Sequence, residues 1–320
     1  RGADGVYMAP DPPEKTEEAG AGGETGGQPG RGKVAFLFPG QGSQRPGMFA
    51  DAFVTFPELQ RHLRHGRDYA DALYPPAAFD KAGEAAQHTA ITDTRVAQPA
   101  LGIVGLAAYT LLTSAGVRPD MAAGHSYGEL IALCAAGVLD PRTLPQLSAE
   151  RAAAILGAAE ADAEEPGTMA AVTAAPDEVE PVLRAAGLDG RVVAANHNAP
   201  RQTVISGPQR DVEEAVRLLR KAGHSAKRIP VACAFHSPLV AGAGARFAEA
   251  LTRHPVREAE FPVWANRTAA PHRAEPDAIR AELAAQIGAP VRFVAQIEAM
   301  YEAGARIFVE AGPGTVLTRF

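Results

Sequence analysis

The sequence predicts an α/β fold with two parts: a large domain built on a parallel β-sheet, and a small ferredoxin-like subdomain inserted into it. Two observations support this prediction. Short apolar segments alternate with a long amphipathic helix and glycine-rich turns in the first part of the chain, which is typical of a parallel sheet. Between residues 166 and 230 the pattern changes to βαββαβ, the order of a ferredoxin-like unit.

The large domain is expected at residues 33–165 and 231–320. Its first element is an apolar strand that breaks at Pro39, and a helix with one apolar face ends at Gly116. A second helix ends at Gly137, since glycine readily takes the left-handed conformation that closes a helix. The expected strands are Val34–Phe38, Val117–Ala123 and Arg306–Glu310, and the expected helices are Pro99–Ala115 and Glu129–Ala136.

The inserted subdomain is expected at residues 166–230. Its expected strands are Thr168–Thr173, Arg191–Ala195, Gln202–Ser206 and Ala226–Ile229, and its expected helices are Asp177–Ala186 and Arg210–Ala222. Residues Asn196–Asn198 are expected to join the two middle strands. A substrate is expected in the cleft between the two parts, because ligand sites commonly lie where two bodies meet.

Composition limits the class of protein. The 320 residues are 46% hydrophobic, which is enough for a large core, and the formal net charge is −6. Without a basic stripe, nucleic acid is not expected as a partner. The sequence lacks a secretion signal and any run of about 18 apolar residues, which predicts a cytoplasmic protein with no membrane partner. The glycosylation triplet at Asn266 is then a chance match. Residues 1–32, rich in Gly, Glu and Pro, are expected to be a flexible linker.

The most informative local pattern is the pentapeptide Gly124-His125-Ser126-Tyr127-Gly128. Glycines two residues on either side of the serine allow a sharp turn from a strand into a helix. Such a turn exposes the serine hydroxyl and leaves the next N–H free to bind an oxyanion, as in α/β-hydrolase-like domains. Ser126 is therefore a candidate nucleophile in an α/β-hydrolase-like domain. An ordinary tight turn is the alternative interpretation.

A nucleophilic serine needs a base, and the chain has nine histidines. His125 is excluded, because neighbouring side chains at the end of a strand point to opposite sides. His236 ends the apolar run Val231–Phe235 and is the candidate base, with a structural histidine as the alternative. Other histidines lie in polar surroundings and are expected to be solvated surface imidazoles, among them His62, His65, His88, His254 and His272.

Five spaced motifs together resemble the malonyl-CoA:acyl carrier protein transacylase family. That family includes the acyltransferase domains of polyketide and fatty acid synthases. The resemblance runs in order from about Val34 to Phe320. The motifs are Phe38-Pro39-Gly40-Gln41-Gly42-Ser43-Gln44, Gln98-Pro99-Ala100-Leu101, Gly124-His125-Ser126-Tyr127-Gly128-Glu129, Ala234-Phe235-His236-Ser237 and Gly312-Pro313-Gly314.

The resemblance implies a role for each matching residue. Ser126 would be the nucleophile and His236 its general base, and the backbone N–H groups of Gln41 and Tyr127 would form the oxyanion hole. Members of the family orient this histidine with a main-chain carbonyl, and the matching position is Gln286. The pair would be a Ser-His dyad without an acidic third member.

The resemblance also implies how the acyl group is chosen. Arg151 matches the arginine that pairs with the free carboxylate of malonyl, a task that suits a bidentate guanidinium. Gln98 would also bind substrate. Phe235 precedes the histidine, where members that load malonyl tend to carry an aromatic residue and members that load methylmalonyl tend to carry serine. Cys233 departs from the usual malonyl-loading pattern, which has a histidine there.

Tyr127 is a second departure, since Leu, Val, Ile or Gln commonly follows the nucleophile. The pattern Gly-His-Ser-Tyr-Gly-Glu resembles acyltransferase domains of iterative, enediyne-type polyketide synthases. The implied partners are malonyl-CoA, an acyl carrier protein that brings phosphopantetheine, and flanking synthase domains. No bound cofactor or metal is implied. The linker composition and the end at Phe320 suggest a domain excised from a multidomain synthase.

Two other functions compete with this interpretation. An α/β-hydrolase-type thioesterase or esterase uses the same elbow, but it places an acid after the serine and a histidine last in the chain. The loop Phe38–Gly42 has no role in such an enzyme. A non-catalytic docking module of a synthase is the second alternative. The presence of Gln41, Ser126, Arg151 and His236 together argues against it.

Overall fold

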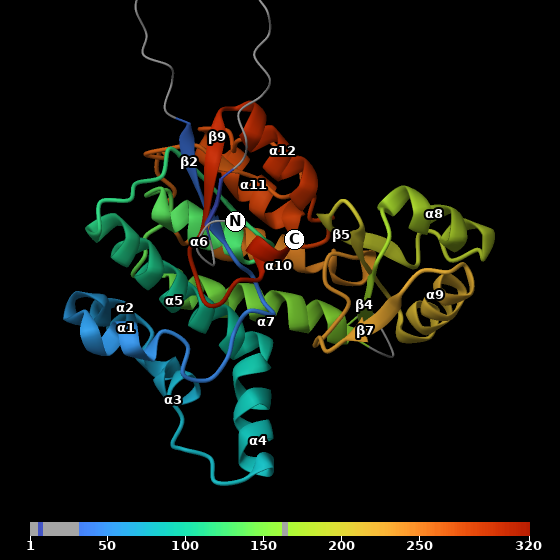
Figure 1. Cartoon of the computed structure of the whole chain (residues 1–320), viewed down its shortest axis with the longest axis horizontal. Helices are drawn as coiled ribbons and strands as arrows, with labels where there is room; N and C mark the ends of the chain where they lie inside the picture. Colours follow the sequence, from blue (N-terminus) through green and yellow to red (C-terminus); the bar gives the residue numbers. More distant parts are fainter. Residues whose placement is uncertain (1–5, 9–31, 162–165) are drawn as a thin grey trace, which may run out of the picture.

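The computed structural model describes residues 6–8, 32–161 and 166–320. These residues form two β-sheets, each with its own helices, and the two bodies lie side by side (Figure 1). The larger body is mixed α/β with a mainly parallel sheet, as the sequence predicts. The smaller body contains the predicted βαββαβ order.

The larger sheet has five strands in the order β1-β9-β2-β3-β8. Four of them are parallel to one another: β9 (Ala305–Glu310), β2 (Lys33–Phe38), β3 (Met121–Gly124) and β8 (Val263–Trp264). β3 is shorter than the predicted Val117–Ala123, because the chain is still in a loop at Pro119. Its last residue, Gly124, begins the serine elbow.

The edge strand β1 (Val6–Met8) corrects the prediction of a linker over residues 1–32. It pairs antiparallel with β9, so that Tyr7 lies opposite Phe308. The composition of the surrounding segment gave no sign of it, since three residues are too few for a periodicity. Apart from these residues and Gly32, the predicted linker lies outside the described residues.

Helices cover both faces of the larger sheet. Alternate residues of β2 point to opposite faces, so Phe36 and Phe38 pack with the core around α5, α6 and α7, while Ala35 and Leu37 pack with that around α12. The helices of this body are α1 (Ala50–Thr55), α2 (Gln60–His65), α3 (Ala70–Leu73), α4 (Lys81–Thr92), α5 (Thr94–Ser114), α6 (Gly128–Ala135), α7 (Leu144–Ala161), α10 (Ala243–Thr252), α11 (Pro276–Gln286) and α12 (Phe293–Glu302).

Helix α5 begins five residues before the predicted start at Pro99. The Asp93 carboxylate caps it by accepting a hydrogen bond from the Arg95 backbone N–H at 2.9 Å, so proline lies inside the helix and does not open it. By length and composition α5 is apolar enough to cross a membrane, but 72% of its most apolar stretch is buried inside the protein. Its apolar character is explained by its place in the core.

The smaller sheet has the order β5-β6-β4-β7, and every neighbouring pair is antiparallel. Its strands are β4 (Thr168–Val172), β5 (Val193–Ala199), β6 (Gln202–Gly207) and β7 (Ala226–Ile229). Residues Asn196–Asn198 belong to β5, so the prediction that they join two strands is wrong. An irregular register in β5 accommodates these polar residues, and the turn follows at Pro200.

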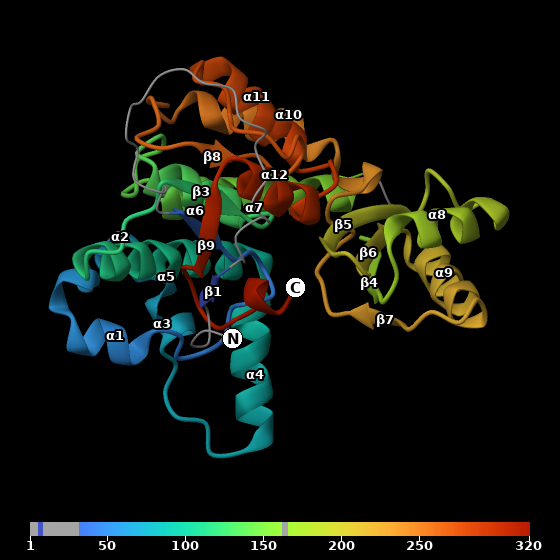
Figure 2. The same ribbon diagram turned by 45° about the horizontal axis from the view of Figure 1, so that its top comes forward.

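Two amphipathic helices, α8 (Pro176–Ala185) and α9 (Gln209–Lys221), cover the face of the smaller sheet that points away from the larger body (Figures 1 and 2). Ala170, Val172 and Ile205 pack against them. The opposite face carries Met169 and Val204, which pack with Phe235. This second face therefore meets the larger body and forms one wall of a pocket.

Candidate active site

Ser126 lies at a sharp turn between β3 and α6. Its φ is +52°, a left-handed value that is uncommon outside glycine and costs free energy unless the surroundings hold it. The glycines of the pentapeptide are needed for close approach: a Cβ on Gly124 would collide with the backbone of Gly128, and one on Gly128 with the carbonyl of Phe38. The predicted strand-turn-helix elbow is therefore present.

Asn266 holds the elbow from behind. Its Oδ1 accepts a hydrogen bond from the Ser126 backbone N–H at 2.6 Å, and its Nδ2 donates to the Gly124 carbonyl. The residue is fully buried. Its side chain thus stabilises the left-handed turn, and its burial is consistent with the prediction that the glycosylation triplet is a chance match.

Ser126 and His236 are brought together from positions 110 residues apart. The Ser126 Oγ lies 2.7 Å from the His236 Nε2. On the other side of the ring, Nδ1 lies 2.9 Å from the Ala289 carbonyl and 3.2 Å from that of Gln286. Since carbonyls only accept, the proton is on Nδ1 and Nε2 is free to accept the serine proton. The sequence named the Gln286 carbonyl alone, and the structure adds the closer one of Ala289.

The surroundings of His236 favour its neutral form. Burial, assisted by the Arg151 charge and by His125, lowers the pKa of the imidazole to about 3. The backbone carbonyls oppose this shift only partly. A neutral imidazole bonded to a serine hydroxyl has the geometry and protonation state of a general base.

Two residues that line the same cavity as Ser126 have backbone N–H groups that are unpaired among the described residues. Those of Gln41 and Tyr127 donate to no protein acceptor within the part of the chain that the structure describes. The loop of Gln41 comes close to the elbow because Gly40 has no side chain: a Cβ there would collide with the His125 carbonyl. Both N–H groups are therefore available as hydrogen-bond donors at the cavity.

Arg151 comes from α7, and its guanidinium is buried, with 2% of the residue exposed. No carboxylate lies within ion-pair distance of it among the described residues. Burial lowers its pKa to about 10, so it stays positively charged at neutral pH. A buried cation without a neutralising partner is costly, and a ligand carboxylate would offset that cost.

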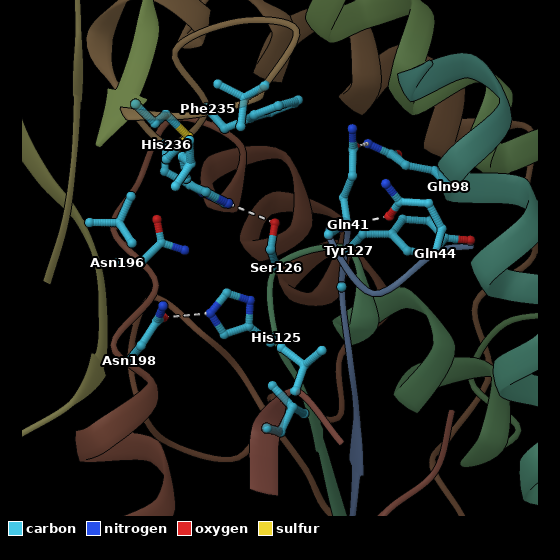
Figure 3. A pocket seen from close by; sticks show the side chains of 18 of the residues that line it. Gln41, Gln44, Gln98, His125, Ser126, Tyr127, Asn196, Asn198, Phe235 and His236 are labelled. Atoms are coloured by element: carbon cyan, nitrogen blue, oxygen red, sulfur yellow. Dashed lines mark hydrogen bonds between the residues drawn. The ribbon is translucent and has the colours of Figure 1, made fainter. Parts of the chain in front are cut away.

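A cavity of about 350 Å³ joins these groups between the two bodies. Figure 3 shows Ser126 pointing toward His236, with Phe235 beside the histidine and Gln98 near Gln41. Gln98 is almost fully buried, and its Oε1 has no partner among the described residues. The smaller sheet contributes Met169, Asn196, Asn198, Val204 and Ile229 to the wall.

All eight predicted site residues therefore converge. Seven line the cavity, and Gln286 lies behind it at the end of α11, in contact with Ser126, Arg151 and His236. As expected, His125 turns away from Ser126: its Nε2 lies 2.7 Å from the Asn198 Oδ1.

Several histidines differ from their predicted solvated state. His65 and His88 are exposed as expected, but His62 and His254 are buried. The side chain of His272 is only 5% exposed and lies 2.8 Å from Glu129 Oε1. Polar neighbours in sequence misled the prediction, because the fold brings apolar or acidic groups from distant segments onto these rings.

Sequence reasoning missed four residues of the site: Glu129, Asn266, His272 and Ala289. Glu129 stands in the serine motif but was predicted only as a helix residue. Asn266 and His272 flank β8, whose two residues give no periodicity. Only their contacts across the fold indicate a role.

Comparison with known proteins agrees with this site. Residues 35–320 match the family model described as an acyl transferase domain. The malonyl CoA-acyl carrier protein transacylase of Bacillus subtilis (strain 168) is 34% identical over 89% of this chain and 88% of its own length. A much longer polyunsaturated fatty acid synthase polypeptide of Thraustochytrium sp. is 33% identical over 90% of this chain, which spans 10% of that polypeptide.

A solved structure extends the similarity to three dimensions. The acyltransferase domain from the second module of the salinomycin polyketide synthase superposes with a TM-score of 0.77 at 33% identity, covering 91% of this chain and 65% of the other. Fold, elbow and sequence all agree with the matched family model. The chain belongs to the acyl transferase domain family.

Proposed function

We propose that this chain transfers a malonyl group from malonyl-CoA to an acyl carrier protein through a seryl acyl-enzyme. The observation that carries the proposal is the 2.7 Å contact between Ser126 Oγ and His236 Nε2, in a pocket that also holds an unneutralised arginine. The name of the Bacillus subtilis relative, malonyl CoA-acyl carrier protein transacylase, describes the same reaction. An α/β-hydrolase-type thioesterase or esterase and a non-catalytic docking module remain the competing functions that the experiment below separates.

The proposed reaction has two half-steps. Ser126 Oγ attacks the thioester carbonyl while His236 Nε2 takes its proton, and the N–H groups of Gln41 and Tyr127 stabilise the oxyanion. The C–S bond then breaks, and the CoA thiolate leaves with the proton from His236. In the second half-step the phosphopantetheine thiol of the carrier protein loses its proton to His236 and attacks the seryl ester. The ester C–O bond then breaks, Ser126 Oγ takes back a proton from His236, and the malonyl group leaves as a thioester on the carrier protein. No bound cofactor takes part.

Arg151 is proposed to bind the free carboxylate of malonyl. Arg151 lines the same cavity as Ser126, and its guanidinium has no competing carboxylate partner among the described residues. Gln98, with an unpartnered buried oxygen in the same cavity, is proposed as a further substrate contact. Selection for an acid-bearing acyl group then follows from charge pairing in a desolvated site.

Finer assignments are also part of the proposal. The body formed by residues 33–165 and 231–320 is proposed to be α/β-hydrolase-like and that of residues 166–230 to be ferredoxin-like, supported by the antiparallel order β5-β6-β4-β7. The motif at Tyr127 supports assignment to an iterative, enediyne-type polyketide synthase in the cytoplasm, flanked by other synthase domains.

Incubation with malonyl-CoA carrying a radiolabel in the malonyl group tests the function directly. A transferase is expected to become covalently labelled and to pass the label to an added phosphopantetheinylated carrier protein. Release of free malonate as the main product would indicate a hydrolase. Absence of both label and malonate would indicate a docking module.

The substitution Phe235→Ser is expected to reduce the preference for malonyl-CoA over methylmalonyl-CoA. The ring lines the cavity next to His236, and exclusion of one methyl group by bulk contributes about 1–3 kcal/mol, or about one to two orders of magnitude in rate. In this variant the ratio of malonyl to methylmalonyl loading is expected to decrease mainly because methylmalonyl is loaded faster. Competition between the two CoA esters for one enzyme sample measures it. An unchanged ratio would place the selectivity at Tyr127 or Gln98.

The rate of acyl-enzyme formation is expected to stay level from about pH 8 down to about pH 5. Burial lowers the pKa of His236 to about 3 from an ordinary value of 6.5, so the neutral, proton-accepting form persists over this range. Rapid-quench measurement of the acylation rate at subsaturating malonyl-CoA reports the ionisation of His236 in the free enzyme. An acidic limb with its midpoint near the ordinary histidine pKa would show that the imidazole is solvated in the working enzyme.

A further inference from the structure

The partner of Arg151 in the resting site is a neutral group. One of its terminal nitrogens donates to the Gln286 side-chain Oε1 at 3.0 Å, and both residues are 2% exposed. The ring centre of Tyr127 lies 6.0 Å from the guanidinium carbon. An amide oxygen satisfies one N–H of the guanidinium without cancelling its charge.

The other end of the Gln286 amide is fixed as a donor. Its Nε2 donates to the Ser126 carbonyl at 2.7 Å and to the Glu129 Oε2 at 3.3 Å. Both are acceptors only, so the amide has one favourable orientation, with Oε1 toward the arginine. The same residue also supplies a main-chain carbonyl to His236.

Glu129 is a buried carboxylate that could neutralise the arginine if it reached it. It is fully buried and is held by the Asn266 backbone N–H at 2.9 Å and by His272. It raises the pKa of Arg151 through space, although burial has the larger and opposite effect. The amide of Gln286 thus lies between the two charged groups, with Arg151 at its oxygen and Glu129 at its nitrogen.

We infer that the Gln286 side chain is a positioning residue that acts as a neutral spacer between Glu129 and Arg151. The inference rests on the proposed function and names a determinant of its substrate choice. By separating the two charges, the amide holds the guanidinium in place and leaves its charge available to the acyl carboxylate. Its second bond, to the Ser126 carbonyl, ties the arginine to the nucleophile, so the carboxylate and the thioester carbon are positioned together.

A carboxylate in place of this amide is expected to pair with Arg151 and compete with substrate. The test compares acylation of Ser126 by malonyl-CoA and by acetyl-CoA, which has no free carboxylate, in wild type and in Gln286→Glu. In Gln286→Glu the ratio of the malonyl to the acetyl second-order acylation rate is expected to fall by about tenfold or more, because the malonyl rate falls. Gln286→Met, which removes both hydrogen bonds but adds no charge, is expected to lower the ratio less. The partly exposed Gln209→Glu at the start of α9 controls for added charge.

The variant Gln286→Glu places two carboxylates in the buried site and could fail to fold for that reason. A double variant that keeps the number of buried charges unchanged provides a second test. The double variant Glu129→Gln with Gln286→Glu moves the single carboxylate next to Arg151, and it is also expected to lose malonyl preference. Equal ratios in the Glu and Met variants, or a wild-type ratio in the double variant, would overturn the spacer role while the proposed function stands. Wild type that forms no malonyl adduct at Ser126 would overturn the proposed function, and the spacer role with it.

Discussion

Substitution of Ser126 by alanine is expected to abolish covalent malonylation of the protein. The Ser126 hydroxyl donates to the Nε2 of the proposed base, and no other hydroxyl in the described chain is paired with that nitrogen. Without it the acyl group has no atom to bind, whatever the affinity for malonyl-CoA. Intact mass spectrometry after incubation with malonyl-CoA measures the adduct.

The exposed Ser114→Ala at the end of α5 is a matched control and is expected to be malonylated normally. Loss of a nucleophile typically costs many orders of magnitude in rate, so residual labelling at a few per cent of wild type would already be inconsistent with Ser126. Persistence of a malonyl adduct in Ser126→Ala would assign the nucleophile to another residue.

Substitution of Arg151 by alanine is expected to weaken malonyl transfer strongly while sparing, or even favouring, acetyl transfer. A desolvated carboxylate that loses its guanidinium partner is left buried and unpaired, which costs about 3–5 kcal/mol, or roughly two to four orders of magnitude in the malonyl-to-acetyl ratio. The cavity gains space and loses a positive charge, and both changes suit an uncharged acyl group.

The measurement is acylation of one enzyme sample by the two CoA esters, each at subsaturating concentration. Arg217→Ala on the exposed face of α9 removes the same type of side chain far from the cavity and is expected to leave the ratio at its wild-type value. An equal loss with both esters would mean that Arg151 supports only the structure of the site.

Removal of Arg151 also bears on His236. The arginine charge is the second cause, after burial, of the lowered pKa of His236. The alanine variant is therefore expected to hold a slightly more basic imidazole, which leaves the acetyl reaction competent at neutral pH. The variant thus loses the contact to the malonyl carboxylate but keeps its base. The ratio of the malonyl to the acetyl acylation rate is therefore the informative quantity.

Local sequence determined the parts of this protein that depend on neighbours in the chain. The glycines of the pentapeptide predict the elbow because the sharp turn brings Gly124 against the backbone of Gly128, four residues later. Gly137 predicts the end of α6 because its φ of +77° is a left-handed value that suits glycine. The βαββαβ order of the smaller body follows from apolar periodicity and turn residues. The family resemblance added residues such as Arg151, which composition alone would leave on a solvated helix face.

Tertiary structure decided what depends on residues far apart in the chain. Asn266 supports the elbow from 140 positions away, and Gln286 joins Ser126, Glu129 and Arg151 across more than 130 positions. His272 is predicted to be solvated from its neighbours in sequence, but the fold places it against the buried Glu129. Sequence patterns report local geometry and the burial of regular faces. Whether a polar side chain is hydrated or held by a distant partner is fixed only when the sheets and helices pack, because packing brings the partners together and removes the water between them.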